Sequence, residues 1–184
     1  MTLQFKIQLA GVKPAVWRSV LVPASFSFDK FHRVIQAAFG WQGYHLYQFS
    51  EKGYGSYPTI GLPSVDNDEE FDDSKKLKLA KIFFTPGQKY VYIYDFGDDW
   101  VHHITLEAVL DVKSTKAALL AGKAACPPDD CGGPHGYGNL LKIINTPQHP
   151  ERAEMLEWIG LEDGETWDSD YFDFETAQKK VIKV

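Results

Sequence analysis

Two segments near the N-terminus alternate apolar and polar residues with the period of a β-strand. In residues 3–10 every second side chain is apolar, and residues 16–22 alternate in the same way. Between them, Gly11 tolerates a positive φ and Pro14 fixes its own φ, which together favour a turn. The chain is therefore predicted to begin with an antiparallel β-hairpin.

The spacing becomes helical after Ser27, which is placed to cap a helix N-terminus. Apolar residues then recur at intervals of three and four positions, at Phe28, Phe31, Ile35 and Ala38. Gly40 is predicted to end this helix, because glycine commonly occupies the left-handed position after a helix. A third strand is predicted over residues 44–50, with His45, Tyr47 and Phe49 on one face and Tyr44, Leu46 and Gln48 on the other.

The middle of the chain holds a predicted loop and a second hairpin. Residues 51–73 are rich in Gly, Pro and acidic residues, a composition typical of a mobile loop, and a short helix is predicted over 77–83. Two strands follow, over 88–96 and 100–110, joined by the turn residues Gly97 to Asp99. Because these strands carry the heaviest aromatic content, we expect them at the centre of the sheet.

The last third of the chain is predicted to be mostly helical. A short helix is expected to begin at Ser114 or Thr115 and end at Gly122, an irregular segment covers 126–138, and helices follow near 139–145, 151–159 and 173–181. The predicted class is α+β with a mostly antiparallel sheet. The order strand, strand, helix, strand, short helix, strand, strand is like that of a β-grasp fold, followed by a C-terminal helical segment. We expect a single domain over 1–184, with a sheet and helix core over 1–112 and a helical tail over 113–184 packed on it.

Composition narrows the function. The 19 Lys and Arg against 25 Asp and Glu give a net charge of −6, and only Arg18, Arg33 and Arg152 are arginines. This balance disfavours specific DNA binding, which needs cations at the phosphates. No apolar run is long enough to cross a membrane, and the N-terminus lacks the apolar region of a secretory signal. We therefore expect a soluble cytoplasmic protein, with no membrane partner and with two cysteines that are free thiols or ligands.

The first candidate site is the segment from Tyr94 to His103. Strand alternation places Trp100 and His102 on the apolar face and His103 on the other. A buried imidazole needs a partner for each nitrogen, so a nearby turn acid could bind one while a ligand or metal takes the other. The alternative is a turn acid that only holds a core histidine. The candidate pocket comprises His45, Asp95, Asp98, Asp99, Trp100 and His102, with His45 contributed by the third strand.

The second candidate site is the proline- and glycine-rich segment that holds both cysteines. Cys126, Cys131 and His135 form a C-x4-C-x3-H arrangement, and with His102, His45 or an aspartate as the remaining ligands they could bind zinc or another transition metal. Two alternatives stay open: buried structural thiols, and a cysteine nucleophile beside a histidine base. The adjacent Asp129 and Asp130 would raise the pKa of a neighbouring thiol and so oppose the nucleophile.

Five segments together identify a family resemblance: Lys13 to Arg18, Phe31 to Gln36, Trp41 to Phe49, Tyr94 to Trp100 with His102, and Ala125 to Tyr137. Over nearly its whole length the chain closely resembles the plasmid pRiA4b ORF-3-like family. The resemblance implies no assigned biochemical activity, although some members are associated with plasmids or transposable elements and some carry a resolvase label. Three scattered arginines cannot form a recombinase centre. The residues that the resemblance marks as recurrent are Asp95, Asp98, Asp99, His102, Cys126, Cys131 and His135.

Two classes of function remain. The first is a binding or interaction module that uses an aromatic cleft between the sheet and the helical tail to bind a protein or a small molecule. The alternative is a metal- or thiol-dependent enzyme with a composite His/Asp/Cys site. An enzyme needs these side chains to converge on one point, whereas a module does not. The partner-facing surface could equally form a homodimer.

Overall fold

The computed structural model describes residues 1–63, 71–162 and 164–184, and its centre is a sheet of eight strands. The order across the sheet is β5-β4-β3-β6-β7-β1-β2-β8. All neighbouring strands are antiparallel except β4 and β5. The strands are β1 (Thr2–Leu9), β2 (Trp17–Pro23), β3 (Tyr47–Ser50), β4 (Thr59–Gly61), β5 (Phe71–Asp73), β6 (Lys89–Tyr94), β7 (Trp100–Leu110) and β8 (Ala118–Lys123).

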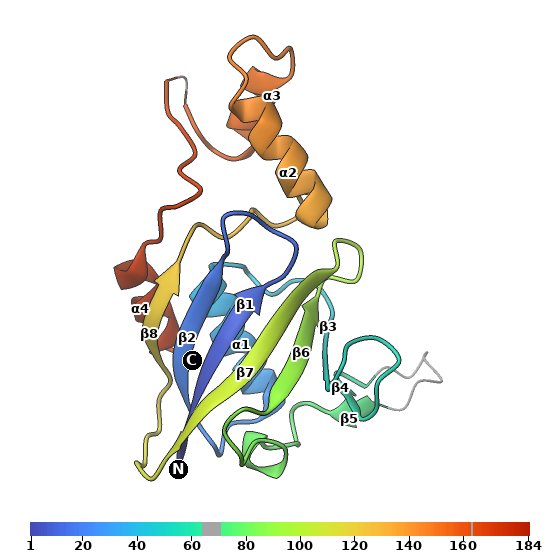
Figure 1. Cartoon of the computed structure of the whole chain (residues 1–184), viewed down its shortest axis with the longest axis vertical. Coiled ribbons are helices and arrows are strands. Elements are labelled where there is room, and N and C mark those ends of the chain that lie inside the picture. Colours follow the sequence, from blue (N-terminus) through green and yellow to red (C-terminus); the bar gives the residue numbers. More distant parts are fainter. Residues whose placement is uncertain (64–70, 163) are drawn as a thin grey trace.

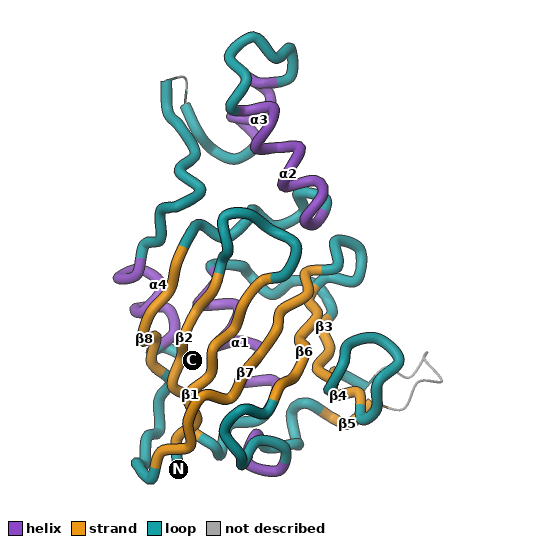
Figure 2. Tube along the Cα trace, viewed as in Figure 1, coloured by secondary structure: helices purple, strands orange, loops and turns teal. Residues whose placement is uncertain are grey.

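The helices lie in two places (Figure 1). One face of the sheet is covered by α1 (Phe28–Phe39) and α4 (Phe174–Val181), while α2 (Gly133–Ile144) and α3 (Arg152–Trp158) form a lobe beyond one end of the strands. A short 3-10 helix, η1 (Leu79–Lys81), precedes β6. Figure 2 shows that long loops connect β8 to α2 and α3 to α4, so the lobe is joined to the sheet by irregular chain on both sides.

The predicted α+β class with a mostly antiparallel sheet is confirmed. The β1–β2 hairpin forms in antiparallel register, and β6 and β7 are the fourth and fifth of the eight strands, which confirms their central position. Ser27 caps α1 by accepting a hydrogen bond from the backbone N–H of Lys30, and Gly40 ends it with φ 97°. Both α1 boundaries therefore follow from the residues that the sequence places there.

The core between α1 and the sheet is largely aromatic. Phe31 of α1 lies 4.7 Å, centroid to centroid, from Phe5 of β1, and Phe28 lies 5.1 Å from Phe49 of β3. All four side chains are fully buried. Each such side chain contributes on the order of 2 to 3 kcal/mol by burial, so this layer holds the helix on the sheet.

The helix predicted to end at Gly122 is wrong, because Ala118–Lys123 forms β8 and pairs with β2. Ser114 accepts a hydrogen bond from Lys116 N–H in a turn instead of capping a helix. Pairing along β2 buries Leu119 and outweighs the local helical pattern.

Three further boundaries differ. The segment predicted as a loop over 51–73 contains β4, which pairs with β3, and β5; its residues 64–70 lie outside the described part of the chain. The third strand, predicted over 44–50, begins only at Tyr47, and residues 44–46 belong to the preceding loop. The helix α2 begins at Gly133 inside the predicted irregular segment, since Pro134 suits a first helical turn. In the described residues, no helix is long and apolar enough to cross a membrane.

Gly122 is predicted to tolerate no side chain. A Cβ built there would lie 2.4 Å from the ring of Phe172 and 2.8 Å from Cδ of Arg18. We expect Gly122→Ala to lower the free energy of unfolding by about 2 kcal/mol, as overpacking does. The matched control is Gly138→Ala in α2, where a Cβ has open space; there we expect a gain of about 0.5 to 1 kcal/mol. Urea denaturation measures both, and equal stability of the two variants would contradict the prediction.

Candidate functional site

Three loops meet at the end of the sheet that faces the α2–α3 lobe: residues 41–46, 95–99 and 126–132. The Asp95 N–H donates to the Leu46 carbonyl at 2.9 Å, which joins the first two. Trp41 Nε1–H donates to the Pro127 carbonyl at 2.9 Å, and Gly132 N–H donates to Asp98 Oδ2 at 3.1 Å. These bonds hold the three loops, which we call the sheet-end loops, in one arrangement.

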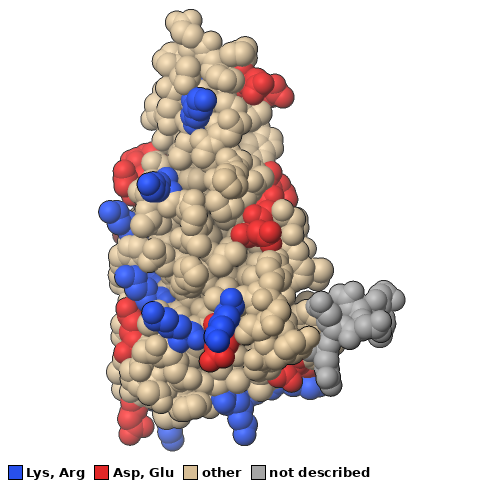
Figure 3. Space-filling view, turned by 45° about the vertical axis from the view of Figure 1, so that its right-hand side comes forward, with Lys and Arg blue, Asp and Glu red and all other residues tan. Residues whose placement is uncertain are grey.

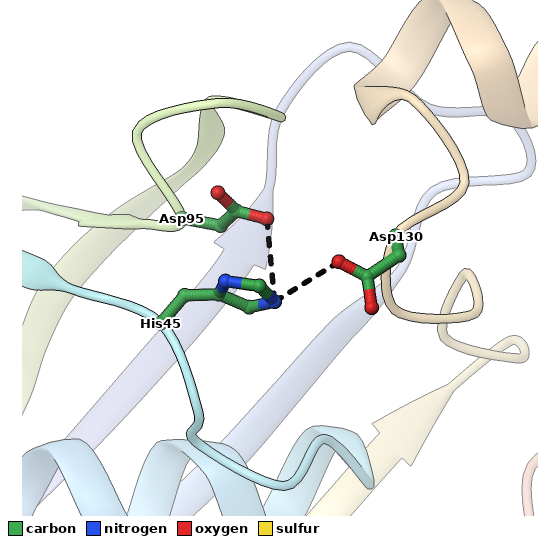
Figure 4. A group of neighbouring side chains, drawn as sticks. All are labelled: His45, Asp95 and Asp130. Atoms are coloured by element: carbon green, nitrogen blue, oxygen red, sulfur yellow. Dashed lines mark ion pairs between the residues drawn. The ribbon is translucent and has the colours of Figure 1, made fainter.

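One residue from each sheet-end loop contributes to a compact polar group, shown in Figure 4. His45 Nε2 lies 3.0 Å from Asp130 Oδ1 and 3.6 Å from Asp95 Oδ2. Both carboxylates point at the same imidazole nitrogen, Asp95 from above and Asp130 from the right in the view. The side chain of Asp95 is 12% exposed, that of His45 32% and that of Asp130 69%, so the group opens to solvent on the Asp130 side.

The turn fixes how Asp95 presents its carboxylate. Its Oδ1 accepts the Gly97 N–H at 2.9 Å and its carbonyl accepts the Asp99 N–H at 2.7 Å, which leaves Oδ2 facing His45. Asp95 and Asp130 both have a left-handed backbone, with φ 57° and 58°. Aspartate tolerates this conformation better than most residues, because its short polar side chain can hydrogen-bond locally.

Carboxylates dominate the charge of this region. Asp98, Asp99 and Asp129 join Asp95 and Asp130, and neither residues 90–112 nor 124–141 contain a lysine or an arginine. Burial raises the pKa of Asp129, and the negative charges of Asp130 and Asp95 add to the effect. Figure 3 shows acidic side chains gathered at mid-height on the face drawn. The sheet-end loops therefore form a negative region that favours a cation.

Large apolar side chains are exposed beside these carboxylates. The exposed fractions are 78% for Tyr44, 61% for Leu46, 56% for Tyr54 and 38% for Phe96. The rings of Tyr54 and Phe96 lie 6.1 Å apart, and the Tyr54 hydroxyl donates to Asp99. The Leu46 carbonyl accepts the Asp95 N–H, so the loop that carries Tyr44 and Leu46 adjoins the turn that carries Phe96. We call this set of residues the acidic–aromatic surface: Tyr44, Leu46, Tyr54, Phe96, Asp95, Asp98, Asp99 and Asp130.

His102 is fully buried and hydrogen-bonded, as strand alternation predicts. Its partner is the Trp100 carbonyl, 2.9 Å from Nδ1, and not one of the turn aspartates. The acids cannot reach it because the ring points into the core, with the Trp41 and Tyr92 rings 5.3 and 5.1 Å away. Burial lowers its pKa to about 3, so the ring is neutral and Nδ1 donates to the carbonyl.

The structure does not bring Cys126, Cys131, His135 and His102 together. Within the described residues, the group of three or more possible metal ligands with atoms within 4.8 Å of one another is His45, Asp95 and Asp130. Cys126 lines a pocket with Arg18 between α1 and α4, Cys131 lines another with Leu140 and Ile143, and His135 is exposed. Four side chains with such different surroundings do not converge on one ion.

The thiols are also poor nucleophiles. Burial raises the pKa of Cys126 well above its ordinary value, although the nearby Arg18 charge opposes this, and burial raises the pKa of Cys131 to about 12. Both are protonated at neutral pH, whereas nucleophilic attack and metal ligation need the thiolate. The raised values agree with the expectation that Asp129 and Asp130 work against a thiolate.

A cleft of about 960 Å³ runs along α1 beside residues 40–47, and His45 lies on its wall. Its lining includes Lys180 of α4, so it lies between the first helix and the C-terminal one. His32 lines it as well, stacked on Tyr47 with ring centroids 3.8 Å apart. Burial lowers the pKa of His32 to about 4, so its ring is neutral.

Sequence reasoning gave Asp130 no binding role. It placed His45 and Asp95 in one candidate pocket, and the structure brings these two together with Asp130 as the third member. The available signal was the pair Asp129-Asp130 after two prolines, in a loop without any cation. The return of this loop to the end of β6 depends on tertiary contacts such as that of Trp41 with Pro127.

Comparison with known proteins gives the family. The model of the plasmid pRiA4b ORF-3-like protein matches residues 1–176. Uncharacterized protein y4hQ of Sinorhizobium fredii is 35% identical over 181 residues, covering 97% of this chain and 90% of that protein. The crystal structure of protein of unknown function MM3350 from Methanosarcina mazei has a TM-score of 0.80 and 30% identity, with 95% of this chain and 96% of that chain covered. The chain belongs to the plasmid pRiA4b ORF-3-like family.

Proposed function

We propose that this protein is an interaction module that binds a basic segment of a partner protein on the acidic–aromatic surface. The observation that carries the proposal is that four exposed apolar side chains lie on adjoining loops that also carry a set of carboxylates. Isolated exposed apolar residues are normal on a protein surface, whereas a contiguous group beside one sign of charge is typical of a recognition surface. The proposal favours a module over a thiol-dependent enzyme because both thiols are protonated.

The chemistry of the surface selects the partner. Asp98, Asp99 and Asp130 attract Lys and Arg side chains, and a nearby charge of opposite sign speeds association. The Tyr44 and Tyr54 rings offer faces to a guanidinium group, which stacks well on aromatic rings. A segment that alternates basic and aromatic residues would therefore meet both kinds of contact. A role in plasmids or other mobile elements fits a module whose partner is encoded nearby.

The surface itself is rigid enough to recognise a partner without refolding. Asp95 is fixed by its turn, Asp98 by Gly132 N–H, and Asp99 by the Tyr54 hydroxyl. Carboxylates that are already oriented lose little conformational freedom on binding, so more of the contact energy appears as affinity.

The test uses two labelled peptides of equal length, one of five Arg-Tyr repeats and one of five Glu-Tyr repeats, with fluorescence anisotropy as the readout. We expect the first to bind in a salt-dependent manner and the second not to bind. The double variant Tyr44→Ala, Leu46→Ala should weaken binding at least tenfold, which corresponds to about 1.4 kcal/mol. Asp99→Asn should weaken it less and reduce the salt dependence.

The matched controls lie away from the surface. Tyr171 is 62% exposed and Asp168 precedes it by three residues in the segment that leads to α4, so Tyr171→Ala and Asp168→Asn change a similar aromatic and a similar charge elsewhere. Both should leave the dissociation constant unchanged. The proposed interaction module would be refuted if both peptides bound equally well, or if the control variants lost as much affinity for the Arg-Tyr peptide as the surface variants.

A further inference from the structure

We infer that His45, Asp95 and Asp130 form a binding site for one divalent transition-metal ion. The site shares Asp95 and Asp130 with the acidic–aromatic surface, but it does not rest on the proposed docking of a basic segment, because it needs only three ligand atoms and no apolar contact. It also differs from the cysteine-containing set that the sequence suggests. The donor atoms are His45 Nε2, Asp95 Oδ2 and Asp130 Oδ1, all within 4.8 Å of one another.

The distances from His45 Nε2 to the two carboxylate oxygens fit a shared ion. Metal bonds to histidine nitrogen and carboxylate oxygen are about 2.0 to 2.2 Å long, which places neighbouring ligand atoms about 2.8 to 3.6 Å apart in octahedral or tetrahedral geometry. The separations from His45 Nε2 are 3.0 and 3.6 Å. The same nitrogen can therefore hold either a proton, in an ion pair with both carboxylates, or a metal ion.

The surroundings orient the ligands as second-shell contacts do in metal sites. Asp95 has its other oxygen bound to Gly97 N–H, and the loop that carries Asp130 is anchored at Pro127 by Trp41 and at Gly132 by Asp98. The three ligands come from three separate loops. A bound ion would thus join the sheet to the segment that carries the α2–α3 lobe.

A buried tyrosine supports the loop that carries the imidazole. Tyr94 is fully buried, and its ring lies edge-on to that of His45 with centroids 5.7 Å apart. Its hydroxyl lies near the backbone N–H groups of His45 and Tyr44. The position of His45 is therefore set by the core beneath it as well as by its two carboxylate neighbours.

The donor set selects the metal. One imidazole nitrogen and two carboxylate oxygens suit Zn²⁺ or Mn²⁺, whereas Ca²⁺ and Mg²⁺ prefer oxygen ligands throughout. Three protein ligands leave at least one coordination position of the ion open. Because the Asp130 side chain is 69% exposed, this position is expected to face solvent. The site is therefore expected to bind Zn²⁺ more tightly than Mg²⁺ and to keep exchangeable water.

The test is isothermal titration of the full chain, freed of metal by dialysis against a chelator, with ZnCl₂, MnCl₂ and MgCl₂ separately. We expect one equivalent of Zn²⁺ with a micromolar or lower dissociation constant and much weaker Mg²⁺ binding. His45→Ala and Asp130→Asn should each weaken Zn²⁺ binding at least tenfold. Both side chains are partly or largely exposed, so these variants are expected to keep the thermal transition of the wild type.

Three variants serve as controls. His103→Ala removes an exposed histidine from the opposite face of β7, and Cys126→Ser and Cys131→Ser remove the thiols. All three should bind Zn²⁺ like the wild type. Absence of Zn²⁺ binding at 100-fold excess over protein, or binding that survives His45→Ala or disappears in Cys131→Ser, would overturn the site.

The peptide test uses metal-free protein, so its outcome does not depend on the metal site. When Zn²⁺ is added, we expect peptide binding to weaken, because the ion neutralises the carboxylates.

Discussion

Lowering the pH from 6.5 to 4.5 is expected to reduce the free energy of unfolding by about 4 kcal/mol, mainly through two buried histidines. Burial lowers the pKa of His32 to about 4 and that of His102 to about 3. Below about pH 6.5 the unfolded chain binds protons that the folded chain excludes. Each histidine then removes about 1.4 kcal/mol of stability per pH unit, so the stabilising effect is complete above pH 6.5 and is lost as the pH falls.

Urea denaturation at several pH values measures this slope. The pKa of Asp129 is raised by burial, so its protonation on folding acts in the opposite direction and offsets part of the loss. In His102→Asn we expect a lower free energy of unfolding at every pH. Its decrease per pH unit between pH 6 and 4.5 should be about half that of the wild type, because only one buried histidine then excludes a proton in the folded state. An unchanged slope in this variant, or a wild type equally stable at both ends of the range, would contradict the assignment of two neutral buried histidines.

Arg18→Ala is expected to lower the free energy of unfolding by about 4 kcal/mol, since the side chain holds four backbone carbonyls in the interior. Its Nε donates to Ala38 at the end of α1, one terminal nitrogen donates to Trp17 and Lys123, and the other donates to Ala124. The guanidinium is 1% exposed and stacks on Phe172 at 3.7 Å. It therefore joins β2, β8, α1 and the C-terminal segment.

Burial lowers the pKa of Arg18 to about 10, so the guanidinium keeps its charge at neutral pH. Arg18→Lys should recover little of the loss, because an ammonium cannot reach all four carbonyls in the planar arrangement of a guanidinium. The control is Arg33→Ala, where the exposed side chain pairs with Asp29 one turn earlier; we expect less than about 0.5 kcal/mol there. A loss below 1 kcal/mol in Arg18→Ala, measured by urea denaturation, would show that these hydrogen bonds carry little stability.

Local sequence patterns correctly predicted the strands in which buried and exposed side chains alternate. In β7, the period of two placed Trp100 and His102 on the buried face, and the turn residues from Gly97 to Asp99 placed the hairpin. The same reasoning missed β8, because its pairing with β2 is a long-range contact that no local period encodes. Gly122, which resembles a helix stop in the sequence, is instead required by the stacked Arg18 and Phe172 side chains.

The candidate site shows the same division. Two of its three residues could be predicted from the sequence. His45 lies in an aromatic segment and Asp95 in a turn, and both segments belong to the long motifs that carry the family resemblance. Its third member could not be predicted, because Asp130 reaches the cluster only through a left-handed backbone and a loop docked by Trp41. The partner predicted for His102 was wrong for a similar reason: a backbone carbonyl two residues away satisfies Nδ1, and backbone acceptors leave no mark in a sequence.

The most direct test of the interaction module is to map where a basic peptide binds. Uniformly ¹⁵N-labelled, metal-free protein is titrated with the Arg-Tyr peptide, and the amide chemical shifts are followed residue by residue. We expect shifts concentrated in residues 44–46, around Tyr54, in 95–99 and around Asp130, with none centred on the pocket lined by Cys131, Leu140 and Ile143 or on the sheet face opposite α1. Shifts centred on either of those other surfaces, or no shifts at millimolar peptide, would contradict it.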